Sequence, residues 1–426
     1  MGSVVEHGSP PPMGRGVAGL AGTSVKRPRA LLLGMAGAST ALVAGTLALE
    51  GLSYVNLDSL TQEAVRFYGL LMLPAALALV CLLMAARPRI VTINLAVLAC
   101  LLVLAEAGAW VLTPVRPAIR GEPDAIGASS FYVPDATLGY AMAPSTVARH
   151  RRTVGETQIY DVTYRTDGRG RRETPTSPGG RRASFLLFFG DSNTFGEGLS
   201  QTQTLPYYAG ERATACRPYN YGVSGYGPAH LLALTRLGRL STEIPEQDGS
   251  AVFFLIPAHV GRVVGSSKVS AGWGRHFPYY EMTDHGAVVT RGDFVHGRPL
   301  ITLAYYFWTK SNLAAYFGVD LPLRYTPHDY RLTAAILKES GRRLAQQLRL
   351  RRFAVILGQV HNEAQRRVID GVRDALVREG VAHLDYTRLF DTRDPRYRLS
   401  EFDYHNSAEA NRTIAMQLVE DLGVPR

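Results

Sequence analysis

Short apolar runs alternate with amphipathic stretches along the second half of the chain. The runs are rich in Phe, Val, Leu and Ile, which is typical of buried strands, and the stretches repeat their apolar residues at helical spacing. Strands are predicted at 184–189, 251–256, 353–357 and 381–384, and helices at 204–214, 228–240, 333–350, 363–378 and 407–422. This alternation predicts an α/β fold whose mainly parallel sheet is covered by helices on both faces.

Less regular stretches surround this pattern. Residues 158–166 alternate as a strand does, and they open a predicted domain of residues 156–426. Within it, residues 263–328 are aromatic and rich in glycine, so we expect an inserted hairpin region there. Residues 116–155 are rich in Pro and Gly, which predicts an irregular linker that leads into the domain.

The first part of the chain contains three long apolar runs, at about 30–50, 67–86 and 90–113. Each is close to the length of about 20 apolar residues that crosses a bilayer as a helix. Buried helices of a soluble protein are an alternative, as is a cleaved signal sequence for the first run. Because three such runs follow one another, we predict three transmembrane helices within residues 30–115.

Charges beside these runs predict their orientation. Three basic residues lie at 26–29 and two at 87–89, whereas residues 50–66 hold three acids and one arginine. Basic flanks stay in the cytoplasm, so the domain after residue 115 is predicted to lie outside it. Residues 1–29, rich in Gly, Pro and Ser, are predicted to be a disordered cytoplasmic tail.

The charge and cysteine content limit the kinds of partner and cofactor expected for the exported domain. The 426 residues include 46 Lys and Arg against 36 Asp and Glu, a formal net charge of +10. Beside a membrane, this excess favours anionic lipid or acidic glycan, and no nucleic-acid partner is predicted. Only Cys216 of the three cysteines lies outside the apolar runs, which excludes a disulfide framework there. No Cys or His pair has the spacing of metal ligands, so neither a metal nor another cofactor is expected.

The stretch FLLFFGDSNTFGEGLS carries the first candidate for chemistry. It places Ser192 directly after a buried strand, at the carboxyl edge of the sheet, where ligands of such folds bind. A tight turn or a helix cap explains Asp and Ser equally well. A phosphate-binding loop fits poorly because the glycine spacing is wrong, and an Asp before the serine differs from the GxSxG elbow.

A serine nucleophile needs a base, and the base needs an orienting acid. Most of the 11 histidines are scattered without a shared spacing. His405 differs, because Asp403 precedes it by two residues in a loop directly before the last predicted helix. On an extended loop both side chains can reach one site, the acid binding one ring nitrogen and leaving the other for a hydroxyl. A capping histidine beside a solvated acid is the alternative.

Three blocks in order, GDSNTFGEG, NYGVSGYG and DYHNSAEANRTIA, resemble those of the SGNH, or GDSL-type, serine hydrolases over residues 155–426. The resemblance implies a flavodoxin-like three-layer α/β/α fold. It also implies that Ser192 is the nucleophile, His405 the base and Asp403 the acid. The oxyanion donors would then be the backbone N–H groups of Ser192 and Gly225.

One position departs from the family's pattern. The family carries an asparagine after its third strand whose amide donates to the oxyanion, whereas this chain continues PAHVGR. His259 stands in that register, and a neutral imidazole can donate one hydrogen bond, so it is a candidate third donor. An alternative is that His259 packs in the core. Arg262 is a candidate contact for a substrate carboxylate or phosphate, and Asn193 is a second candidate substrate contact.

Together these features predict a membrane-anchored serine esterase or O-acyl transferase that acts outside the cytoplasm. Its predicted partners are an acylated polysaccharide or lipid-linked glycan, because aromatic residues of the insertion can stack on sugars, and the membrane itself. A different possibility is a non-catalytic glycan-binding or scaffold protein of the same fold in envelope polysaccharide assembly. The missing asparagine favours that alternative, and the Ser, His and Asp favour the enzyme.

Overall fold

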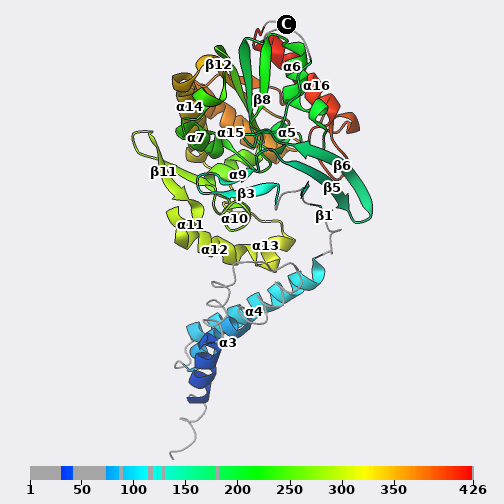
Figure 1. Cartoon of the computed structure of the whole chain (residues 1–426). Coiled ribbons are helices and arrows are strands. Elements are labelled where there is room, and N and C mark those ends of the chain that lie inside the picture. The colour runs from blue at the N-terminus through cyan, green and yellow to red at the C-terminus, as the bar shows by residue number, and fades with distance from the viewer. Residues whose placement is uncertain are drawn as a thin grey trace, which may run out of the picture. The chain divides into compact units, whose positions relative to one another are not determined.

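A computed structural model describes residues 30–41, 73–85, 90–113, 119–121, 123–126, 130–177 and 182–424. The chain divides into two compact units, Met1–Thr113 and Pro114–Arg426. Figure 1 shows the helices and strands of both. The predicted tail, residues 1–29, lies outside the described residues.

The smaller unit contains apolar helices. Residues Ala30–Ala41 form a short one, α3 is Leu73–Ala85 and α4 is Ile90–Leu112. Among the described residues, one helix, Thr92–Leu112, has the length and composition that could cross a bilayer. The three-span prediction is therefore met by one helix only, because the first two described helices are too short. Residues 42–50, 67–72 and 86 of the first two predicted spans lie outside the described part of the chain.

A five-stranded parallel sheet organises the larger unit. Its strands pair in parallel in the order β13-β12-β9-β7-β8. Their bounds are β7 Ser184–Phe189, β8 Cys216–Asn220, β9 Asp248–Leu255, β12 Arg349–Leu357 and β13 His383–Asp385. The predicted parallel α/β sheet is confirmed. The strand β8 was not predicted because Arg217 and Pro218 interrupt its apolar pattern, and proline is tolerated there because β8 is an edge strand.

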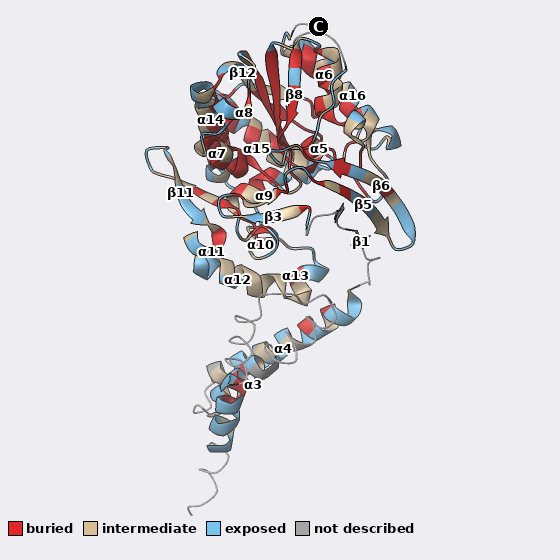
Figure 2. Cartoon of the chain, viewed as in Figure 1, coloured by how far each residue is buried: buried red, intermediate tan, exposed pale blue. Residues whose placement is uncertain are grey.

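Alternate residues of β7 face two separate cores, since successive side chains of a strand point to opposite faces. Phe185, Leu187 and Phe189 pack against the helices of one face, and Leu186 and Phe188 against those of the other. The first face is covered by α7 (Pro228–Arg236), α14 (Pro327–Gln347) and α15 (Glu363–Glu379), and the second by α6 (Leu205–Arg212) and α16 (Ala408–Asp421). Figure 2 shows the sheet buried between these two helical layers.

Six strands lie between residues 119 and 165, so the described part of 116–155 is not the irregular linker that was predicted. We call β1, β2, β5 and β6 the antiparallel sheet, in which β5 pairs with each of the other three. Beside it, β3 and β4 form a hairpin. The bounds are β1 Ile119–Arg120, β2 Asp124–Ile126, β3 Tyr132–Asp135, β4 Gly139–Met142, β5 Val147–Val154 and β6 Thr157–Arg165.

Strand β5 was not predicted because charged residues interrupt its apolar pattern. Ala148 and His150 are buried on its inner face, but Arg149 and Arg151 on its outer face both bind Asp161 of β6. A strand whose side chains are mainly basic therefore resembles a polar loop in the sequence.

The insertion at 263–328 contains the predicted hairpin, formed by β10 and β11. It also contains four helices that were not predicted. The bounds are α10 Ser267–Ser270, β10 Pro278–Met282, β11 Val288–Asp293, α11 Phe294–Gly297, α12 Pro299–Thr309 and α13 Asn312–Tyr316. The remaining short elements are α5 Ser192–Phe195, η2 Gln201–Gln203, α8 Leu240–Glu243, α9 Ala258–Val264 and η3 Pro395–Tyr397.

Candidate active site

Ser192 lies where the central strand β7 turns into α5. Gly190 makes the turn with φ of 152°, and a Cβ there would come within 2.3 Å of the Thr194 hydroxyl oxygen. Asp191 caps α5, because its Oδ1 accepts the backbone N–H of Asn193 at 3.0 Å. The tight turn therefore presents Ser192 at the carboxyl edge of the sheet, as predicted for a ligand site of such a fold.

Ser192, His405 and Asp403 form a continuous chain of hydrogen bonds. His405 Nδ1 lies 2.5 Å from Asp403 Oδ1, and His405 Nε2 lies 2.8 Å from Ser192 Oγ. The Asp403 carboxylate only accepts, so Nδ1 carries the proton and Nε2 keeps a lone pair for the serine hydroxyl. The structure thus brings Ser192 together with two residues that lie more than 200 positions later in the sequence.

The charges around His405 favour its protonation. Burial alone would lower the pKa of His405, but the hydrogen bond that its Nδ1–H donates to Asp403 and the negative charges of Glu197, Asp403 and Asp191 outweigh it and raise this pKa. Burial would raise the pKa of Asp403, yet the contacts with His405 and the charge of Arg152 lower it. Asp403 therefore stays ionised beside the imidazole, which suits a base that must accept a proton.

The antiparallel sheet supplies a cation to this site. Arg152 Nη1 on β5 lies 2.7 Å from Glu197 Oε1 and 4.0 Å from Asp403 Oδ2. Within the described residues, Asp403 Oδ2 is buried and makes no hydrogen bond, so Arg152 is the cation that balances it. Glu197 is held on its other oxygen by the Ser224 hydroxyl at 2.7 Å. Arg152 and Glu197 were not predicted from the sequence.

His259 does not face the reacting serine, so its predicted role as an oxyanion donor is not supported. It is fully buried, and its Nδ1 accepts the backbone N–H of Ile256 at 3.2 Å. The proton must then sit on Nε2, which faces Asp191 Oδ2 at 3.3 Å. Burial lowers the pKa of His259 and outweighs the charge of Asp191, so the ring is neutral.

Arg262 lies beside the same carboxylate. Its Nη1 donates to Asp191 Oδ2 at 2.9 Å and to the carbonyl oxygen of Tyr226 at 2.6 Å. Burial would raise the pKa of Asp191, but His259 and Arg262 lower it, so Asp191 remains ionised. The guanidinium also lies 5.8 Å from the ring of Trp273 and lines the cavity in front of Ser192. Of the two predicted substrate contacts, Arg262 is thus at the cavity.

Asn193, the other predicted contact, is used to hold two loops together. Its Oδ1 accepts the backbone N–H of Asn406, the residue after His405, at 3.2 Å. This bond ties the loop of the serine to the loop of the histidine. Asn193 is therefore placed to position Ser192 and His405 rather than to bind substrate.

Gly225, predicted as an oxyanion donor, lies at the cavity. Its φ is 90°, and a Cβ there would come within 2.3 Å of the Tyr140 hydroxyl oxygen and 2.7 Å of the Trp273 ring. Only glycine fits this approach of the chain to two aromatic side chains. Gly225 and Ser192 lie on opposite loops that line the same cavity.

The cavity in front of Ser192 and His405 has a volume of about 860 Å³. Its wall combines aromatic rings with charged groups, and most of it comes from outside the parallel sheet. The antiparallel sheet and the β3–β4 hairpin contribute Tyr132, Tyr140, His150, Arg152 and Tyr164, and the insertion contributes Trp273. The tyrosines could not be predicted as site residues, since they fall in the predicted linker and on β6.

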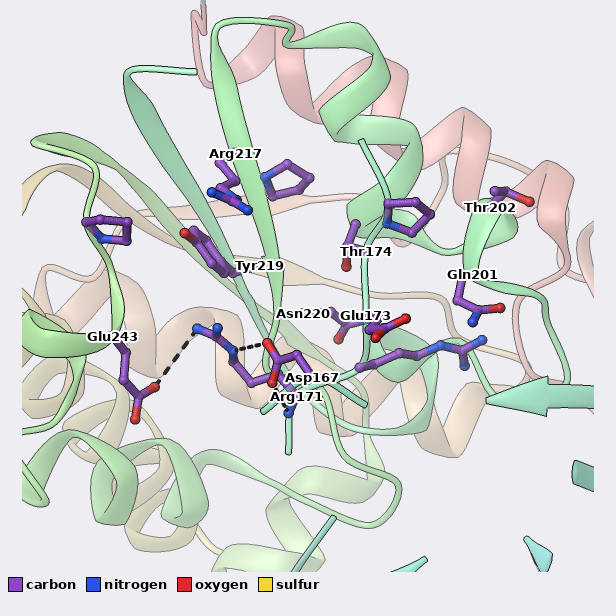
Figure 3. Close-up of a pocket in the computed structure, with 14 residues that line it drawn as sticks. Asp167, Arg171, Glu173, Thr174, Gln201, Thr202, Arg217, Tyr219, Asn220 and Glu243 are labelled. Atoms are coloured by element: carbon purple, nitrogen blue, oxygen red, sulfur yellow. Dashed lines mark hydrogen bonds and ion pairs between the residues drawn. The ribbon is translucent and has the colours of Figure 1, made fainter. Parts of the chain in front are cut away.

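A second cavity, of about 620 Å³, lies beside the edge strand β8 (Figure 3). Its charged groups bind one another: Arg171 Nε lies 2.8 Å from Asp167 Oδ2, and Arg171 Nη1 lies 4.0 Å from Glu243 Oε2. None of Ser192, His405 and Asp403 lines it. In the described part of the chain, no three His, Cys, Asp or Glu side chains are grouped as metal ligands.

No protein-family model matches this chain, and no curated protein matches it. Solved structures do match. A lipolytic protein of the G-D-S-L family from Veillonella parvula DSM 2008 is 12% identical, with 56% of this chain and 97% of that chain covered and a TM-score of 0.31. LAE5, an alpha/beta hydrolase enzyme from the metagenome of Lake Arreo, Spain, is 16% identical, with 58% and 98% covered and a TM-score of 0.34. TesA is 13% identical, with 56% and 97% covered and a TM-score of 0.31.

Proposed function

We propose that this protein is a serine-dependent ester hydrolase or O-acyl transferase. The observation that carries the proposal is the hydrogen-bonded chain from Ser192 through His405 to Asp403. In this mechanism Ser192 Oγ attacks an ester carbonyl carbon while His405 Nε2 takes the hydroxyl proton. His405 then returns that proton to the leaving alcohol, and Asp403 holds the ring and stabilises the imidazolium.

The acyl-enzyme formed on Ser192 has two fates. Water attacks it in a hydrolase, and a sugar hydroxyl attacks it in a transferase; in both cases His405 removes the proton of the attacking oxygen. Backbone N–H groups of Ser192 and Gly225 would hold the oxyanion. Each such donor lowers the barrier by about 2.7–4 kcal/mol, so two of them sustain substantial catalysis without a side-chain amide.

We propose acylated cell-surface glycans as substrates. Tyr132, Tyr140 and Trp273 line the cavity with aromatic surface of the kind that stacks on sugar rings. Arg262 at the cavity would contact a carboxylate or phosphate of an acidic glycan. The predicted location of this domain outside the cytoplasm would bring it to such glycans, and protection from protease added outside intact cells would contradict that location.

A serine-reactive fluorophosphonate probe tests the mechanism without knowledge of the substrate. The full chain should be labelled, Ser192→Ala should not be, and Thr202→Ala, which removes an exposed hydroxyl close in sequence, should be labelled normally. Turnover of a chromogenic acetyl ester should follow the same order. Equal labelling of the wild type and Ser192→Ala would contradict the proposal. Addition of an oligosaccharide then separates transfer from hydrolysis, because only a transferase moves the acyl group to it.

One observation favours a second candidate, a non-catalytic glycan-binding or scaffold protein. His259, the only side chain in register with the expected asparagine, faces Asp191 instead of the cavity. Such a protein would bind acylated glycan with equal affinity as wild type and as Ser192→Ala, and neither would turn over an ester. Titration calorimetry with glycan fragments, run beside the ester assay, distinguishes the two functions.

A further inference from the structure

The helix α12 has a composition that soluble domains normally bury. Its sequence is PLITLAYYFWT, yet none of its 11 residues is buried. The side chains of Leu300, Ile301 and Leu303 are 80%, 48% and 52% exposed. Single exposed apolar residues are ordinary, but a continuous group of them marks a surface that binds something.

The apolar surface extends beyond α12. Phe317, which follows α13, is 70% exposed, and Leu323 is 74% exposed. The helix α12 contacts both α10 and α13, and Leu321 exchanges two hydrogen bonds with Ser267 of α10, which fixes the chain near Leu323 to the same helices. We call Leu300, Ile301, Leu303, Phe317 and Leu323 the α12 surface.

Charges around this surface are mainly positive. Between residues 299 and 324 the chain carries Lys310 and Arg324 against a single acid, Asp320, whereas Arg298 before them is bound to the carbonyl oxygens of Val264 and Gly265. The Asp320 carboxylate is already bound by the Ser267 hydroxyl at 2.6 Å and the Lys268 backbone N–H at 3.0 Å. Basic residues beside exposed Leu, Ile and Phe side chains complement the anionic headgroups and acyl chains of a lipid leaflet.

Aromatic residues add to this match. The second half of α12 reads YYFW, residues 305–308. Tyr and Trp favour the boundary between headgroups and acyl chains, because one end of each ring system is apolar and the other forms hydrogen bonds. These four residues are half-buried in the structure, so α12 combines exposed Leu and Ile with aromatic residue types that favour a membrane interface.

A short connection joins α4 to the larger unit. Only six residues separate Leu112, the end of α4, from Ile119, the start of β1. Fully extended, they reach about 25 Å. If α4 crosses the bilayer, as the sequence predicts, the domain is held at the membrane surface, where an exposed apolar helix meets lipid at high effective concentration.

We propose that the α12 surface docks onto an anionic lipid bilayer. Leu300, Leu303 and Phe317 would enter the boundary of headgroups and acyl chains, and the basic residues would meet lipid phosphates. The helix α10, which α12 contacts, leads into Trp273 at the wall of the active-site cavity. Docking would thus bring that wall near the lipid headgroups. The proposal rests on the membrane attachment predicted from the sequence and not on the ester chemistry of the proposed function.

A fluorescent label on the full chain tests this docking. The variant Leu303→Cys, made with Cys100→Ser so that the remaining Cys81 and Cys216 are buried, is labelled with an environment-sensitive dye and reconstituted into vesicles of phosphatidylcholine and phosphatidylglycerol. We expect a blue shift and loss of most emission when the lipids carry doxyl quenchers. The matched control is Val377→Cys on α15, 63% exposed in the same unit, which should keep its emission.

Each result decides the proposal. Unquenched dye at 303 overturns it, and so does quenching at 303 that disappears on dilution of the protein, since this indicates a second copy of the chain. If the dye at 303 is quenched to the same extent in vesicles of phosphatidylcholine alone, the claim that docking needs anionic lipid is overturned. Label on the native Cys100 of α4 reports membrane insertion separately. Quenching at 100 without quenching at 303 would therefore refute docking while leaving membrane attachment, and the ester chemistry, intact.

Discussion

The two sheets of the larger unit contribute to the candidate site in different ways. The parallel sheet presents Ser192 at the end of β7, and its flanking loops present Asp403 and His405. The antiparallel sheet carries none of these three residues, yet Arg152 of β5 is the cation beside Asp403, and Tyr164 of β6 lines the cavity. Reacting groups thus come from one sheet, and their electrostatic setting comes from the other.

The largest effect is expected within the parallel part. Asp403→Asn should lower kcat by a factor on the order of 10³ to 10⁴, because an amide at this position stabilises the wrong tautomer of the histidine. Ester turnover at fixed pH measures it. The control Asp391→Asn changes an exposed acid that binds only Arg393, and its activity should be unchanged. If kcat of Asp403→Asn falls by less than tenfold, His405 does not depend on this acid.

Arg152→Met tests whether the antiparallel sheet takes part in the chemistry. The variant leaves Glu197 and Asp403 without their cation, so both carboxylates raise the pKa of His405 further above its ordinary value. His405 acts as a base only when neutral, so the acidic limb of the kcat/KM profile should move to higher pH. We expect kcat/KM at pH 6 to fall about tenfold more than at pH 8.

A neighbouring arginine gives the matched control for that profile. Arg151 points away from Arg152 on the same strand and binds Asp161 on the outer face. Arg151→Met should therefore leave both limbs of the profile in place. If Arg152→Met lowers kcat/KM equally at every pH, its role is structural and the antiparallel sheet does not tune the base.

Arg172→Met should change stability more than chemistry. This arginine, in the turn after β6, is 1% exposed and donates to the carbonyl oxygens of Gly196 and Leu199 at 2.8 and 2.5 Å. Burial lowers its pKa to about 10. Its loss removes a charge-assisted hydrogen bond from each of these carbonyls, and we expect the free energy of unfolding to fall by about 2 kcal/mol. Urea unfolding measures it, and Arg169→Met, exposed in the same turn, should have no effect.

The same difference between the sheets decided what could be predicted. Strands β7, β9 and β12 are buried on both faces, so their residues form continuous apolar runs that the sequence displays directly. The triad followed from the resemblance of three blocks. Strand β5 is missed because three arginines, Arg149, Arg151 and Arg152, make its sequence resemble a polar loop. Only the alternation of Ala148, His150 and Arg152 on one face could have indicated a strand. No local sequence pattern indicates that Arg152 lies beside the Asp403 carboxylate, which is 251 positions later in the chain.

The smallest effect is expected at Glu197, which belongs to neither sheet but joins them. Its Oε1 binds Arg152 and its Oε2 binds the Ser224 hydroxyl. Its negative charge helps to raise the pKa of His405, so Glu197→Gln should move the acidic limb of kcat/KM to lower pH, opposite to Arg152→Met. At pH 6 we expect a gain of about two- to threefold, because more of the imidazole is neutral.

The double variant Arg152→Met/Glu197→Gln then separates charge from position. If the two residues act on His405 only through their charges, the double variant should have an acidic limb between those of the single variants, and its kcat/KM at pH 8 should match the wild type within about twofold. A loss at pH 8 that exceeds the sum of the single losses would mean that the Arg152–Glu197 pair holds the loop of Ser192 in place. The antiparallel sheet would then act on the nucleophile as well as on the base.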